Sequence, residues 1–124
     1  MGLGFAMGLG LTMVACSRRA HDVRSLHYVD GELRSSPPVT PRSYTAYFRA
    51  RMALEERPPN YDAAREQLGV ALRDTPEDPH LWTVLGEIEE QAGRPEPAMI
   101  AARKALTFEP GYTRARQLRA RLSK

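Results

Sequence analysis

Apolar side chains recur at helical spacing from residue 79 to residue 112, and the rest of the chain is organised around this stretch. In its first half the apolar positions are Leu81, Trp82, Leu85 and Ile88, and the polar positions facing away are Glu87, Glu89 and Glu90. Asp78-Pro79 begins this helix, because Asp accepts hydrogen bonds from free amides and Pro is tolerated at the first helical position. Gly93 ends it, because Gly enters the left-handed region without strain. The spacing predicts an amphipathic helix between these two signals.

A second helix is predicted from Arg94-Pro95 to Glu109-Pro110-Gly111. The residues along one of its sides are mostly small: Ala98, Ala101, Ala102, Ala105 and Leu106. Gly86 of the preceding helix is also small. Small residues allow two helices to approach closely, so that Trp82 and Leu85 can fill the space between them. The stretch therefore predicts a helical hairpin.

The hairpin closely resembles a tetratricopeptide repeat (TPR). That family spaces characteristic residues over about 34 positions, and they stand here as Trp82, Leu85-Gly86, Ala98, Ala105 and Pro110. Ala102 replaces the usual aromatic residue and Glu89 the usual Tyr. The resemblance implies an all-α fold of tandem TPR hairpins, a right-handed α-solenoid.

The second helix of the hairpin has an earlier copy. A shift of 34 residues takes Pro110 to Pro76. The same shift takes Ala98, Ala102 and Ala105 to Ala64, Leu68 and Ala71. Residues 60–74 are therefore expected to form an equivalent helix, with Asn60 as its cap.

The partner of this copy is predicted from about Ser43 to Glu56, and Pro58-Pro59 supplies the turn. Its large apolar residues are Tyr44, Tyr47, Phe48, Met52 and Leu54. A strict shift places Phe48 at the Trp82 position, whereas one extra loop residue places Tyr47 there and buries Leu54. We favour the extra residue, which gives two repeats over residues 43–112.

The last segment, residues 113–124, predicts a capping helix. Leu118 and Leu122 lie one turn apart with Ala115 on the same side, and arginines occupy much of the rest. Repeat arrays end in a polar-faced helix because a terminal repeat cannot bury both faces. Three repeats are usually needed for stability, so residues 24–34 or a partner protein are candidates to complete the stack.

Residues 1–15 carry no charge and are too few to cross a bilayer comfortably, since a spanning helix needs about 20 apolar residues. They suit the apolar core of a secretion signal. Met13-Val14-Ala15-Cys16 resembles a bacterial lipobox, in which the Cys becomes the lipidated first residue. The family prefers Leu where Met13 stands. The usual basic leader is missing, so the true start is expected upstream.

Cys16 is the only cysteine, which excludes an internal disulfide. Lipidation is the favoured interpretation; an incidental thiol and a reactive thiol are the alternatives. The lipobox resemblance implies acyl chains that anchor the protein to a membrane of a bacterial envelope, facing the periplasm. Ser17 resembles the signal that directs lipoproteins to the outer membrane.

Residues 16–42 are interpreted as the lipidation site and a flexible Ser/Pro linker, because Ser35-Ser36-Pro37-Pro38 is typical of an extended tether. His21 and His27 do not form a metal set with Asp22 and Asp30, because the spacing does not converge on one helix face.

Composition narrows the function classes. The 124 residues suffice for one small domain, and 18 basic residues against 15 acidic ones give a net charge of +3. Charges of both signs are interspersed along the helices, which disfavours a nucleic-acid binder. No nucleophile elbow or phosphate loop is present, so we expect no enzyme, cofactor, metal or small-molecule substrate.

The TPR resemblance implies a groove lined by the first helix of each pair, which could take a peptide segment. The candidate groove residues are Arg49, Glu56, His80, Thr83, Glu87, Glu90, Gln91, Arg114, Gln117 and Arg121.

Together these features predict a lipid-anchored TPR adaptor that binds a protein partner at an envelope membrane. Pilotin-like lipoproteins, which help pilus or secretin machines assemble, resemble it in outline. The alternative is a permanent structural subunit of an envelope complex.

Overall fold

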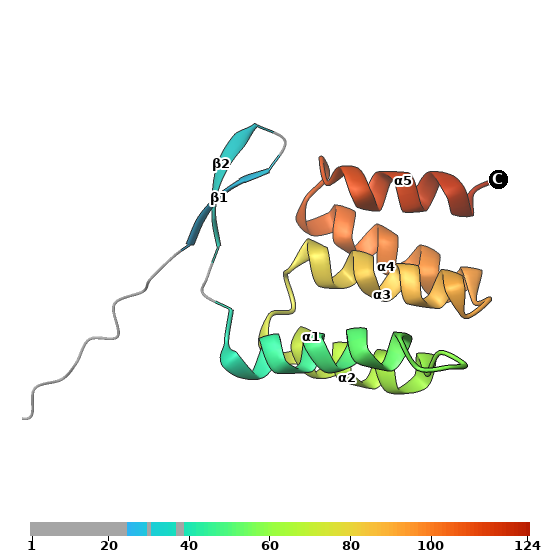
Figure 1. Ribbon diagram of the computed structural model, residues 1–124. Helices are drawn as coiled ribbons and strands as arrows, with labels where there is room; N and C mark the ends of the chain where they lie inside the picture. Colours follow the sequence, from blue (N-terminus) through green and yellow to red (C-terminus); the bar gives the residue numbers. More distant parts are fainter. Residues whose placement is uncertain (1–24, 30, 37–38) are drawn as a thin grey trace, which may run out of the picture.

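The computed structural model describes residues 25–29, 31–36 and 39–124. The predicted signal segment 1–15, Cys16 and His21 lie outside these residues. Within them the chain forms a β-hairpin followed by five helices (Figure 1). The helices are α1 (Pro41–Leu54), α2 (Tyr61–Asp74), α3 (Pro79–Gln91), α4 (Pro95–Phe108) and α5 (Thr113–Leu122).

The helices pack as two antiparallel pairs and a cap. α1 packs on α2 and α3 on α4, α2 contacts α3, and α5 rests on both α3 and α4. Figure 1 shows the pairs stacked one above the other with α5 at the end of the stack. The prediction of an all-α fold of tandem TPR-type hairpins with a C-terminal capping helix is confirmed.

The predicted caps form as their residue types require. The Asp78 carboxylate accepts hydrogen bonds from the amides of His80 (2.8 Å) and Leu81 (3.4 Å). The Asn60 side chain accepts one from the Ala63 amide at 3.0 Å. Gly93 has φ 74°, which is the left-handed conformation expected where α3 ends.

The 34-residue repeat holds for the second helices. α2 and α4 begin 34 residues apart and are equally long. Ala64, Leu68 and Ala71 are fully buried, and so are their counterparts, which are Ala98, Ala102 and Ala105. The equivalence predicted from the sequence is therefore confirmed.

The first helices match less simply. The connection over residues 55–60 has six residues, whereas residues 92–94 suffice in the second pair. The prediction of a single extra loop residue is therefore wrong. Tyr47 and Leu54 are nevertheless half-buried against the core, as that register required, and Tyr47 contacts the ring of His80.

The core face of α1 is built mainly from small residues. Its buried residues are all small: Ser43, Ala46, Ala50 and Ala53. Tyr44, Phe48 and Met52, the larger side chains, remain 66%, 56% and 54% exposed. Small residues occupy the inner face because α1 and α2 lie close together, and large side chains there would force the two helices apart.

Part of the predicted linker is a β-hairpin rather than an extended tether. β1 (Ser25–Val29) pairs antiparallel with β2 (Glu32–Ser36), and Val29 lies opposite Glu32. Asp-Gly between two strands is a strong hairpin signal, and Gly31 has φ 83° as a tight turn requires. Neither strand packs against a helix of the described chain (Figure 1).

Gly86, which is buried in α3, marks a close approach between helices. A Cβ added there would lie 2.6 Å from Leu118 Cδ2, 3.1 Å from the Ala98 carbonyl oxygen and 3.4 Å from Ala101 Cβ. One glycine thus sets the distance of α3 from both α4 and α5. The sequence-based role of Gly86 as a close-contact residue agrees with this geometry.

We predict that Gly86→Ala lowers the free energy of unfolding by about 1–2 kcal/mol, because overpacking outweighs the gain in helix propensity. Urea unfolding followed by circular dichroism measures it. Gly69→Ala is the matched control. The nearest atom to its new Cβ is the end of the Arg73 side chain at 3.8 Å, so stability should rise by about 0.5–1 kcal/mol. An unchanged or stabilised Gly86→Ala protein would contradict the close-packing interpretation.

Candidate partner groove

The candidate groove residues come mainly from α3 and α5, and the structure pairs several of them with one another. Arg114 donates from Nε and Nη2 to the two carboxylate oxygens of Glu87, at 2.6 and 2.5 Å. One turn further along α3, and about two turns further along α5, Arg121 donates in the same way to Glu90, at 3.1 and 2.9 Å. Both are bidentate pairs, whose planar geometry fixes orientation as well as distance.

These two pairs tie the capping helix to α3. The guanidinium of Arg121 lowers the pKa of the Glu90 carboxyl, and the hydrogen bonds that Arg114 donates to Glu87 raise the pKa of Arg114. Glu90, Arg114 and Arg121 are therefore charged at neutral pH. Since the arginines are about half exposed, each pair contributes modestly to stability. The four side chains lie near the surface, and each already forms an ion pair within the protein.

Thr83 does not line a groove. Its side chain is fully buried, and its hydroxyl donates to the Pro79 carbonyl oxygen at 2.7 Å. Gln91 and Gln117 are exposed, as are Arg49 and Glu56 on the first pair. The structure therefore brings Glu87, Glu90, Arg114 and Arg121 together.

His80 belongs to an aromatic cluster at the start of α3. Its Nδ1 lies 3.2 Å from the hydroxyl oxygen of Tyr112, and its ring centroid lies 5.6 Å from that of Tyr47. The cluster joins α1, α3 and the residue that precedes α5. In the neutral imidazole, Nδ1 can accept a hydrogen bond from the Tyr112 hydroxyl. Sequence analysis did not find this cluster, because its members are more than 30 residues apart.

Burial sets the protonation state of the cluster. It lowers the pKa of His80, a shift that Asp78 and Glu87 oppose and that Arg114 and Arg51 reinforce. Burial also raises the pKa of the Tyr112 phenol. The imidazole and the phenol are therefore both neutral at physiological pH, and the centre of this surface is aromatic and uncharged.

A second polar feature is a buried ion cluster around Glu89, which is only 3% exposed. Arg65 of α2 donates to it from Nε and, at 3.3 Å, from Nη2, while Arg94 Nε lies 3.4 Å away. The prediction that Glu89 faces away from the core is wrong. It stands where the TPR pattern has a Tyr, and the two arginines satisfy a carboxylate that could not otherwise be buried.

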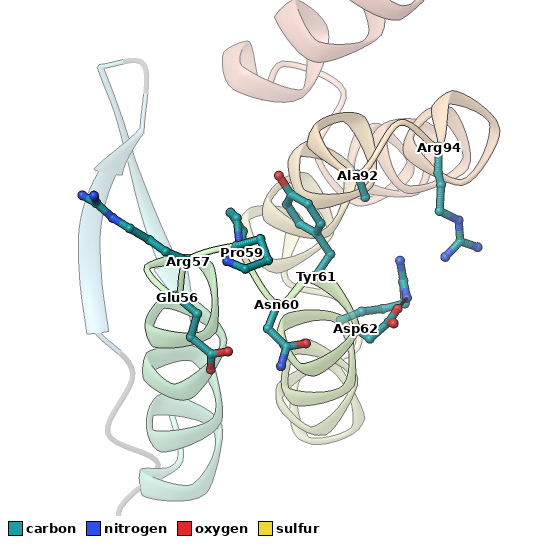
Figure 2. Close-up of a pocket in the computed structure, with 10 residues that line it drawn as sticks. Glu56, Arg57, Pro59, Asn60, Tyr61, Asp62, Ala92 and Arg94 are labelled. Carbon is teal, nitrogen blue, oxygen red and sulfur yellow. Dashed lines mark hydrogen bonds and ion pairs between the residues drawn. The ribbon is translucent and has the colours of Figure 1, made fainter.

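Beside this cluster lies an open pocket of about 560 Å³ between the two interhelical connections (Figure 2). Glu56 lies on its wall with Arg57, Tyr61, Ala92 and Arg94. Glu56 is thus near the C-terminal end of α3, whereas His80 is at the other end of that helix. In Figure 2 the Arg57 side chain points away from Arg94, so these two basic groups do not converge on the pocket.

The described residues contain no group of three or more His, Cys, Asp or Glu side chains placed to hold a metal ion. In the same part of the chain, no helix is both long and apolar enough to cross a membrane.

We predict that acidification weakens the fold through His80. Its pKa is lower in the folded protein than the usual 6.5, so the unfolded chain binds the proton more tightly. Stability is therefore complete above the unfolded pKa and falls as the pH drops below it. Urea unfolding between about pH 7.5 and about pH 5.5 should show this loss, and His80→Asn should reduce it. Equal pH slopes in the two proteins would exclude His80 as the cause.

Part of the chain matches a known protein family. A family model described as tetratricopeptide repeat matches residues 79–122, and no curated protein matches the chain. The matched residues span α3, α4 and α5, which include Gly86 and both bidentate pairs. TPR repeats are typically non-catalytic modules for protein–protein interaction. Residues 79–122 thus carry a tetratricopeptide repeat, within a fold of tandem repeat hairpins.

Proposed function

We propose that the protein is a lipid-anchored adaptor that binds a protein partner at a bacterial envelope membrane. The observation that carries the partner-binding part is the surface shared by α3 and α5, where charged pairs border an uncharged aromatic cluster. The four charges are fixed in position by hydrogen bonds, so they are preorganised for a partner. Peptide recognition combines such charges with pockets for side chains.

The aromatic cluster supplies the apolar part of this surface. Tyr and His present a flat ring with a polar end, which suits contact with both apolar and polar groups of a peptide. Arg51 and Arg114 are close enough to affect the His80 pKa. A peptide segment with an apolar residue and a nearby carboxylate would therefore fit this site best.

The anchoring part is supported by the sequence alone. The lipobox-like residues before Cys16 would direct acylation, and several acyl chains on one residue anchor stably where a single chain does not. Ser17 favours the outer membrane. The helices would then work on the periplasmic side, where a pilotin-like assembly factor acts on a pilus or secretin machine.

The partner-binding experiment exchanges two charges without changing their sum. We predict that Glu87→Arg combined with Arg114→Glu keeps the α3–α5 pair but weakens the protein partner co-isolated from envelope membranes about tenfold, because the order of the charges is reversed. The control exchanges two exposed residues of α4, by Glu96→Arg with Arg103→Glu. Quantitative mass spectrometry of the co-isolated proteins reads out both. If the two variants captured equal amounts of the partner, the proposal that the α3–α5 surface binds it would be wrong.

The same preparations test the anchor independently. The mature chain should begin with a triacylated Cys16, and Cys16→Ala should leave the membrane fraction. An unmodified thiol on a chain that stays at the membrane would overturn the lipid anchor, and would leave the groove unaffected.

A further inference from the structure

The first helix of the array carries an uncovered apolar stripe. Tyr44, Phe48 and Met52 recur every four residues along α1, so they lie in one row on the helix surface. They are more than half exposed. They belong to the six large apolar side chains that are exposed in the described chain, and they are the only three that share one helix.

The second pair shows what covers such a row inside the molecule. Aligned on Ala50 and Gly86, the fully buried small residues of the two first helices, Phe48 corresponds to Val84 and Met52 to Ile88. Val84 and Ile88 are each 1% exposed and belong to the core cluster that α3 shares with α1 and α2. On α3 this face is thus covered by the preceding helical pair. α1 has no preceding pair among the described residues.

Charged residues along the edges of the stripe indicate which kind of partner would bind there. Arg49 lies along one side of it and Arg51 along the other, and both are exposed. No ion pair links either guanidinium to a carboxylate within the described chain. Unpaired arginines beside an apolar row favour an occupant with acidic residues beside its own apolar row.

We propose that this stripe docks an amphipathic helix of another protein, with apolar residues at i and i+4 flanked by Asp or Glu. Such a helix would cover the exposed face of α1 as the first helical pair covers the equivalent face of α3. Ridges of side chains on the two helices would interlock along the row. A second copy fits less well, because its arginines would face those of the first. An anionic membrane fits less well too, because Glu55 and Glu56 lie exposed at the end of the stripe.

The row of Tyr44, Phe48 and Met52 lies outside the α3–α5 groove, although Arg51 is near both surfaces, and the proposal does not rest on the lipid anchor. It is tested in cells with the full chain, by placing the photo-cross-linking residue benzoyl-phenylalanine at position 48. The control position is Ile100 of α4, which is 66% exposed, as Tyr44 is. Adducts are digested and sequenced to identify the segment that reacted.

The expected adduct at position 48 maps to a single helix-forming segment of another protein, with acidic residues beside its apolar row, and is absent at position 100. Arg49→Glu with Arg51→Glu should reduce it at least about threefold, since two exposed charge pairs become repulsive. Circular dichroism checks that this double variant keeps its helices. Adducts to lipid, to residues 1–36 of the same chain or to a second copy would each overturn the proposal, as would no adduct or a segment without acidic flanks.

Discussion

The structure depends on close contact between α3 and the two helices packed beside it, and that contact depends on the missing side chain at Gly86. Leu118 fills the space that a Cβ would take, and the Ala98 backbone lies directly beside it. Because α3 is the middle helix, a change in its spacing is felt by α4 and α5 together. The alanines of α4, buried on the facing side, serve the same close approach.

From this contact the molecule acquires two different ends. At the α5 end, Leu118 and Ala115 are buried, and two bidentate pairs hold the outer helix in place. At the α1 end, Phe48 and its neighbours remain open to solvent. The stack is thus closed at one end by its own cap and open at the other. This asymmetry favours a partner that adds to one end over self-association into longer arrays.

Some elements could be predicted from the sequence because local or repeated signals determine them, and others could not. The second helices were predicted well, because the Asn60 cap acts locally and the 34-residue spacing repeats. The first helix, α1, was also predicted, but the side of it that faces inward was not, because its alanines and its large apolar residues both recur at helical spacing. Periodicity alone does not say which of two apolar rows faces inward. Only the close packing against α2 decides that.

Partners distant in sequence were also beyond prediction. Glu89 was expected at the surface because its burial requires Arg65, 24 residues earlier, and Arg94. Four candidate groove residues were correctly placed on α3 and α5, but their mutual pairing followed only from the packing of the cap. The hairpin was missed although Asp30-Gly31 signals a turn, because the Ser/Pro run after it dominated the interpretation.

The most direct test of this account is native-state hydrogen exchange measured for each amide of the full chain. α3 is covered on both sides, whereas α1 and α5 are each covered on one. Amides in the middle of α3 should therefore exchange at least about tenfold more slowly than those in the middle of α1 or α5, since local opening is easiest at the ends of a repeat array. Equal protection in the three helices, or greatest protection in α1, would contradict the central place of the contact at Gly86.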